Sequence, residues 1–232
     1  MSKLQGKLNY LLDKYAVKNR AVLSEDNKSV TISGKEYKLL PWRNERRIVE
    51  LKKIVESGTV GQISHFKTMS INPKTTQLDY IIKREIDTAE FIAGFKVTQI
   101  FKAQNGNACS VMCMTDKNAV LTLELSTTLP AKAEIIDKHE IITDRGTACD
   151  RAVDSQTPLY SVYVYGEKQK EYIDVDFELY GLSVYEISVV RQAFDIAKDE
   201  KLGAENNKAD ARLEKILQKA AQSEKTTADV AI

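Results

Sequence analysis

Six β-prone runs follow one another between Lys96 and Gly181, and the turns between most of them are too short to hold a helix. Asn105-Gly106 and the segment DKN at residues 116–118 have the chemistry of tight turns. Strands joined by such short connections pair antiparallel, because a parallel pair needs a long crossover. The runs therefore predict one large, mostly antiparallel sheet. The six runs are KVTQIFKA, ACSVMCMT, NAVLTLELS, AEIIDKHEIIT, PLYSVYVYG and EYIDVDFELYG.

Helices are expected before and after these runs along the chain. Apolar residues recur at helical spacing near residues 3–16, 48–55, 79–94, 183–199 and 210–222. Three short β-prone runs between residues 21 and 40 predict a small meander, and the polar stretch DRGTACDRAVDSQT at 144–157 predicts a loop. The C-terminal tail TTADVAI at 226–232 is expected to be loose. The expected class is α+β: a large, mostly antiparallel open sheet with helices packed on one face, plus a short N-terminal helix and β-meander.

The second face of the predicted sheet is not hydrophilic. In the run YSVYVY, Tyr160, Val162 and Val164 alternate with Ser161, Tyr163 and Tyr165, so both faces are at least half apolar. Helices can cover one face only. The other face is therefore expected to pair with another chain, which predicts a homo-oligomer.

Composition restricts the class of partner. The net charge is +1, with 29% charged and 43% apolar residues, which argues against a dedicated nucleic-acid surface without excluding a local basic patch. No apolar run is long enough to cross a bilayer, and charges interrupt the N-terminal segment, so a membrane is not an expected partner and the expected location is cytoplasmic. Three cysteines without a CxxC pair predict small buried thiols, not a disulfide framework or zinc site.

The densest group of polar residues lies in IDKHEIITDRGTACDRAVD. Asp137 and His139 stand two apart, so they share a face if the segment is a strand. With Asp144 they are the candidate catalytic residues, because a carboxylate beside an imidazole can serve as a general base or ligate a metal. The other interpretation is a solvated hairpin and loop with weak surface ion pairs. The loop also contains Arg145, Asp150, Arg151 and Asp154.

One segment resembles a known family. The run LPWRNERRIVELKKIVESGTVGQISHFK, with the turn SGTVGQI at Ser57–Ile63, is similar to the helix and strand that follow the nucleotide domain in Gfo/Idh/MocA oxidoreductases. KNAVLTLELS resembles a later strand of that family, and ILQKAAQSEKTTADVAI resembles its closing helix. The resemblance covers residues 40–232 and implies the family's C-terminal sheet domain, which contributes substrate contacts and oligomer interfaces.

The family's redox motifs have no counterpart in this sequence. No two glycines are separated by one residue, so the first half of a G-x-G-x-x-G dinucleotide loop is absent, and no lysine precedes a proline as in the family's E-K-P motif. The family's D-x-x-x-H motif aligns with DTAEF, which places Asp87 at the Asp and Phe91 at the His. We therefore expect no cofactor, with residues 1–40 standing where a Rossmann domain would be and residues 41–232 forming the sheet domain.

These observations predict a non-redox relative of the oxidoreductases that acts as a ligand-binding or oligomeric assembly module. Its expected partners are a second copy, through the open sheet face, and a small carbohydrate-like ligand, with no nucleic acid. The alternative is a cofactor-independent or metal-assisted enzyme that acts on a carbohydrate-like ligand through Asp137 and His139. A partner subunit of a full-length family member is a third possibility.

Overall fold

The computed structural model describes residues 2–150, 161–165, 170–173, 178–226 and 230–232. For residues 161–165, 170–173 and 226 it describes the backbone only. The chain forms two compact units, Met1–Glu45 with Val175–Arg212 and Arg46–Asp174 with Leu213–Ile232. The domain boundary predicted between residues 40 and 41 rests on the family resemblance and stays a prediction.

The first unit combines helices with a small antiparallel sheet in the order β1-β2-β3. Its elements are α1 (Lys3–Lys14), β1 (Ala21–Leu23), β2 (Ser29–Ile32), β3 (Lys35–Lys38), the 3₁₀ helix η1 (Pro41–Asn44), α4 (Val184–Lys198) and the first part of α5 (Glu200–Thr226). Ser183 and Glu186 form a capping box at the start of α4, which satisfies its first backbone N–H groups. The predicted N-terminal helix and meander are both present.

The leucines of α1 form the core of this unit. Leu4, Leu8, Leu11 and Leu12 are buried together with Val30 and Ile32 of β2 and with Val189, Val190 and Ala193 of α4. Gln192 of α4 also binds the backbone of Leu40, donating to its carbonyl at 2.8 Å and accepting from its N–H at 2.5 Å. The amphipathic spacing read from the sequence thus corresponds to a buried helix face.

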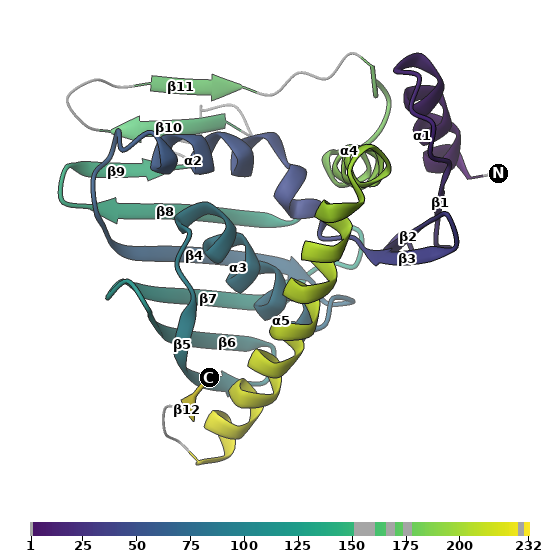
Figure 1. The fold of residues 1–232 in the computed structure, drawn as a ribbon. Helices are drawn as coiled ribbons and strands as arrows, with labels where there is room; N and C mark the ends of the chain where they lie inside the picture. The colour runs from purple at the N-terminus through teal and green to yellow at the C-terminus, as the bar shows by residue number, and fades with distance from the viewer. Residues whose placement is uncertain (1, 151–160, 166–169, 174–177, 227–229) are drawn as a thin grey trace. The chain divides into compact units, whose positions relative to one another are not determined.

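The second unit contains a sheet of nine described strands in the order β11-β10-β9-β8-β4-β7-β6-β5-β12 (Figure 1). Only β4 and β7 run parallel among the described strands; every other neighbouring pair is antiparallel. The strands are β4 (Ile63–Pro73), β5 (Val97–Asn105), β6 (Ala108–Thr115), β7 (Val120–Leu129), β8 (Ile136–Thr143), β9 (Gly146–Cys149), β10 (Ser161–Tyr165), β11 (Lys170–Ile173) and β12 (Val230–Ala231). The predicted fold class is confirmed.

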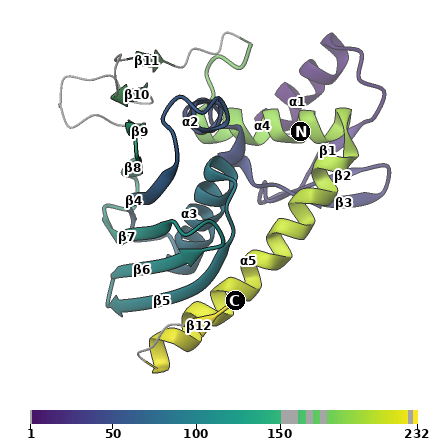
Figure 2. The same cartoon turned by 60° about the vertical axis from the view of Figure 1, so that its left-hand side comes forward.

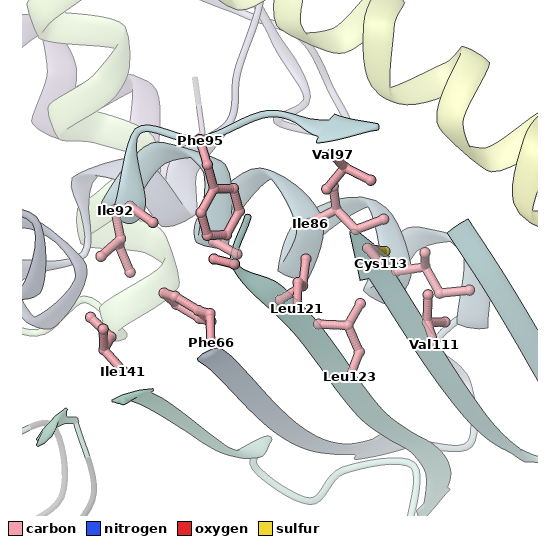
Figure 3. Packing of buried hydrophobic residues seen from close by; sticks show 14 of the residues in the cluster. Phe66, Ile86, Ile92, Phe95, Val97, Val111, Cys113, Leu121, Leu123 and Ile141 are labelled. Carbon is pink, nitrogen blue, oxygen red and sulfur yellow. The ribbon is translucent and has the colours of Figure 1, made fainter. Parts of the chain in front are cut away.

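Helices α2 (Arg46–Glu56) and α3 (Leu78–Ala93) cover one face of this sheet (Figure 2). The core between the sheet and these helices contains Phe66 from β4 and Leu121 and Leu123 from β7, packed against Ile86 and Ile92 of α3 (Figure 3). Helix α3 ends where Gly94 adopts φ 64°, a left-handed conformation that glycine takes without a steric penalty.

Three local predictions need correction. The stretch predicted as a loop contains β9, which pairs with β8 and buries Ala148 and Cys149. Helix α5 begins at Glu200, well before the predicted start, and the C-terminal tail predicted to be loose contains β12, which pairs with β5. Tyr160 lies outside the described residues and the side chains of β10 are not described, so the two-faced pattern there stays a prediction.

The three cysteines are buried and free, as predicted. Among the described residues, no helix has both the length and the apolar content that a bilayer crossing requires.

Candidate functional site

Asp137 and His139 lie on β8 and share the face that α2 and α3 cover. In the sheet they pair with Ser70 and Thr68 of β4, whose side chains are also buried. The predicted common face is therefore confirmed. The solvated-hairpin interpretation is wrong for this pair, because the His139 side chain is only 2% exposed and that of Asp137 only 10%.

Both ring nitrogens of His139 face carboxylates. Nδ1 lies 2.5 Å from Asp150 Oδ2 and Nε2 lies 2.8 Å from Glu85 Oε2, while the His139 backbone N–H donates to Asp150 Oδ1 at 2.6 Å. Burial alone would lower the pKa of His139, but the charges of Asp150 and Glu85 outweigh it and raise the pKa to about 10. The imidazole is thus a cation that donates from both nitrogens.

Two arginines complete this group. Arg47 of α2 contacts Asp137 through Nη1 at 2.6 Å and Nη2 at 3.0 Å, and its Nη1 also lies 3.0 Å from Asp150. Arg84 of α3 donates from Nε to Glu85 at 2.6 Å. Its Nη2 donates to Ser70 at 2.9 Å and lies 3.4 Å from Asp137.

We call Arg47, Arg84, Glu85, Asp137, His139 and Asp150 the buried charge cluster. Three cations face three carboxylates, so the cluster is neutral as a whole. Burial is the largest single influence on Asp137 and Glu85 and opposes their ionisation. The neighbouring cations together outweigh it, Arg47, Arg84 and His139 for Asp137 and Arg84 and His139 for Glu85, so the pKa of both carboxyls is lowered. The cluster joins α2 and α3 to β8 and to Asp150, the residue after β9.

This geometry restricts the chemistry of His139. A general base needs an unprotonated nitrogen and a metal ligand needs a free lone pair, whereas the raised pKa of His139 keeps a proton on both ring nitrogens, each of which faces a carboxylate. Across the part of the chain that the structure describes, no three His, Cys, Asp or Glu side chains are grouped so as to hold a metal ion. The catalytic roles of Asp137 and His139 stay predictions, and the observed contacts oppose them.

Asp144, the third predicted site residue, lies at the turn between β8 and β9 and has a different set of contacts. Its Oδ1 accepts from the Gln62 backbone N–H at 2.8 Å. This contact explains the SGTVGQI turn: Gly61 has φ 82°, and a Cβ there would lie 2.1 Å from Asp144 Oδ1. The Asp144 carboxylate thus anchors the entry to β4. Of the loop residues named with it, Arg151 and Asp154 lie outside the described residues.

We expect Gly61→Ala to lower the free energy of unfolding by about 2–3 kcal/mol, since it combines left-handed backbone strain with a clash against Asp144. Gly58→Ala is the matched control, because Gly58 has φ 68° but a Cβ added there would meet no atom within 4 Å, and it should cost only about 1 kcal/mol. Urea denaturation of both variants measures the difference. Equal losses would show that Asp144 does not restrict this position.

Sequence reasoning missed Arg47, Arg84 and Glu85. A signal was present in α3, where Glu85 stands three or four residues from Ile81, Ile82 and Ala89 and therefore falls within the apolar stripe of the helix; Arg84 and Glu85 are indeed among its buried residues. Phe91, which occupies the family's His position, packs beneath Lys52 of α2. The Lys52 ammonium lies 4.5 Å from the ring centroid and donates to the Phe91 carbonyl at 3.1 Å.

The sheet face opposite the helices exposes a mixed surface. Met69, Met112 and Met114 are 38%, 50% and 41% exposed. Charged residues of both signs lie between them, and in one row across three strands Met69 pairs with Lys138 on one side and Glu124 on the other. We call this surface the open face; its described charged and methionine side chains are Lys67, Met69, Met112, Met114, Glu124, Lys138 and Glu140.

Comparison with solved structures confirms the resemblance at the level of the fold. Over most of its length the chain has the fold of Gfo/Idh/MocA-type oxidoreductases. The apo form of levoglucosan dehydrogenase has a TM-score of 0.66 at 12% identity, and the match covers 83% of this chain and 65% of that one.

Two further structures match similarly. An oxidoreductase from Agrobacterium radiobacter, solved with NAD+, L-tartaric acid and magnesium, has a TM-score of 0.64 at 15% identity, and the match covers 82% of this chain and 63% of that one. An oxidoreductase domain protein from Kribbella flavida has a TM-score of 0.63 at 11% identity, with coverages of 83% and 64%. The chain thus spans under two thirds of these relatives, and such identities show a common fold alone. No protein-family model and no curated protein matches the sequence.

Proposed function

We propose that these 232 residues form a non-redox assembly module that pairs with a second copy of the chain through the open face. The sequence supports the non-redox role, because none of its glycine pairs has the G-x-G spacing that a dinucleotide loop requires. The described N-terminal residues support it too. They form α1 and an antiparallel three-stranded sheet, whereas dinucleotides bind at the switch point of a parallel, doubly wound sheet.

The composition of the open face carries the proposal of self-association. Among the side chains that the structure describes on this face, two lysines, Lys67 and Lys138, are balanced by two glutamates, Glu124 and Glu140. In a two-fold interface the same patch meets itself, so equal numbers of both signs allow each cation to face an anion of the other copy. The exposed methionines supply flexible apolar contact that adapts to the facing surface.

Met112→Glu tests this role. A charge placed in the middle of a two-fold interface is buried twice without a partner, so we expect the dimer dissociation constant to rise about 100-fold or more. Val22→Glu is the control, because Val22 is 59% exposed on β1, a strand of the first unit that contributes nothing to the open face. Light scattering after gel filtration measures the mass. A monomeric wild type, or equal dissociation by Val22→Glu, would contradict the proposal.

The alternative enzyme on a carbohydrate-like ligand fits the contacts less well. Its acid–base pair would be Asp137 and His139, and both are engaged in ion pairs within the buried charge cluster. Asp144 lies on a turn and supports the backbone of Gln62. A small carbohydrate-like ligand and a cytoplasmic location stay predictions, since levoglucosan dehydrogenase is named for its own substrate and shares only the fold.

A further inference from the structure

The exposed large apolar side chains of the first unit differ in chemistry from those of the open face. Four of them are tyrosines: Tyr10, Tyr15, Tyr180 and Tyr185 are 49%, 52%, 83% and 44% exposed. Tyrosine combines a large rigid apolar ring with a hydrogen-bonding hydroxyl, and it is enriched at protein interfaces. Such a group of exposed rings on one small unit needs an explanation beyond its own fold.

Two of the tyrosines contact one ion pair, and a third lies next to that ion pair in the chain. The Lys14 ammonium lies 5.8 Å from the centroid of the Tyr10 ring and 5.4 Å from that of Tyr15, and it pairs with Glu178. The Tyr15 hydroxyl donates to the same carboxylate at 2.8 Å. Tyr180 follows two residues later in the chain. We call Tyr10, Lys14, Tyr15, Glu178 and Tyr180 the tyrosine patch.

Basic residues surround this patch. Lys3, Lys7, Tyr10 and Lys14 recur at i, i+4, i+7 and i+11 along α1, so they form one stripe of that helix. Lys3 donates to the carbonyl of Gly181 at 2.6 Å, which places the start of this stripe beside Tyr180. Residues 1–20 contain five basic side chains and a single acidic one, Asp13, and Arg20 already pairs with Asp13 at 2.6 Å.

Helix α4 extends the same surface. The Phe194 ring packs against Tyr15 with ring centroids 5.6 Å apart, and the Lys198 ammonium lies 5.4 Å from the Phe194 centroid. Helices α1 and α4 lie side by side in both views (Figures 1 and 2). The rings of Tyr10, Tyr15 and Phe194 are thus held on or next to two packed helices with cations beside them, and such preorganisation lowers the entropy cost of binding.

We propose that the tyrosine patch is a docking surface for an acidic polypeptide segment. The cations supply charge complementarity, and the tyrosine rings supply the apolar contact that dominates binding energy in protein interfaces. A single-stranded nucleic acid fits less well. Glu178 lies inside the patch, and an acidic peptide can place an uncharged residue against it, whereas a nucleic acid carries a phosphate at every nucleotide; the chain as a whole also carries a net charge of only +1.

Fluorescence anisotropy with a labelled peptide of about twelve residues, a Glu-Glu-Leu repeat, tests the proposal. We expect binding that weakens as salt is raised, since exposed charges are screened. Tyr180→Ala and Lys3→Glu should each weaken binding about 5-fold or more, whereas Lys35→Glu, the same charge change on β3, should leave it unchanged. Tyr180 is so exposed that its truncation should not affect folding, which circular dichroism verifies.

Three results would overturn the proposal. The first is the absence of salt-sensitive binding to the peptide, and the second is an equal loss of binding in Lys35→Glu. The third is tighter binding to a labelled oligothymidine than to the peptide, which would assign the patch to nucleic acid. The tyrosine patch shares no residue with the open face, so a monomeric protein would leave this test valid.

Discussion

Arg47→Met is expected to lower the free energy of unfolding by about 3–5 kcal/mol, because it removes the closest cation from buried Asp137, which keeps only the longer contact with Arg84, and one of the two cations that face buried Asp150. Methionine is a long, flexible and apolar side chain, so the lost packing is small and the loss reports the charge. Chemical denaturation of the purified chain measures it. The large effect arises because one charge is removed while the charges that it faced stay buried. The intact cluster, compared with apolar side chains of the same shape, can contribute close to zero to the free energy of unfolding.

The neighbouring residue offers a matched control. Arg46 lies on the same helix and pairs with Glu50 at 2.9 Å, but its side chain is 53% exposed, and Lys53 also pairs with Glu50 at 3.0 Å. Arg46→Met should therefore cost less than about 1 kcal/mol. If the two variants lose the same amount, the buried charge cluster is not the anchor that joins α2 to the sheet.

Stability should fall as pH rises from neutral to about 10. The pKa of His139 is raised in the folded state from 6.5 to about 10, so folding takes up a proton at every pH between these values. The stabilisation from the charged imidazole is complete below pH 6.5 and is lost by pH 10. In this window the free energy of unfolding should fall by up to about 1.4 kcal/mol per pH unit. Urea denaturation at about pH 7 and about pH 9 measures the change.

The only other histidine in the sequence serves as the control for this pH dependence. His65 lies on β4 beside Thr122, and its pKa is lowered by partial burial and by the charge of Lys67. The His65→Gln protein should therefore still lose stability at alkaline pH. The His139→Gln protein should lack the part of this loss that comes from the His139 imidazole. A wild-type protein equally stable at both pH values would contradict a charged His139.

Much of the fold could be predicted because its signals are local. The leucine spacing of α1, the glycine at position 94 and the short turns between β5, β6 and β7 each act within a few residues. Strand β9 was missed because its four residues are too few for a periodic pattern, and it forms through pairing with β8. Helix α5 was predicted too short, since its first turns have few apolar residues of their own.

The candidate site was only half predictable for the same reason. The i, i+2 spacing of Asp137 and His139 predicted their common face, but the partners of His139 come from α3 and from the end of β9. Glu85 and Asp150 are 54 and 11 residues away in sequence, so no local pattern could pair them with His139. Asp144 was grouped with the pair because it follows β8, although a reversal of the chain directs it to Gln62.

The protonation state of His139 at neutral pH tests most directly whether the predicted site residues are structural. Long-range ¹H–¹⁵N spectra of the imidazole report each ring nitrogen, and His65→Gln removes the second signal. We expect both nitrogens of His139 to stay protonated from about pH 6 to about pH 8 and to be unaffected by added zinc. A titration near the ordinary histidine pKa, or a shift on adding zinc, would show a free nitrogen and favour the enzyme instead.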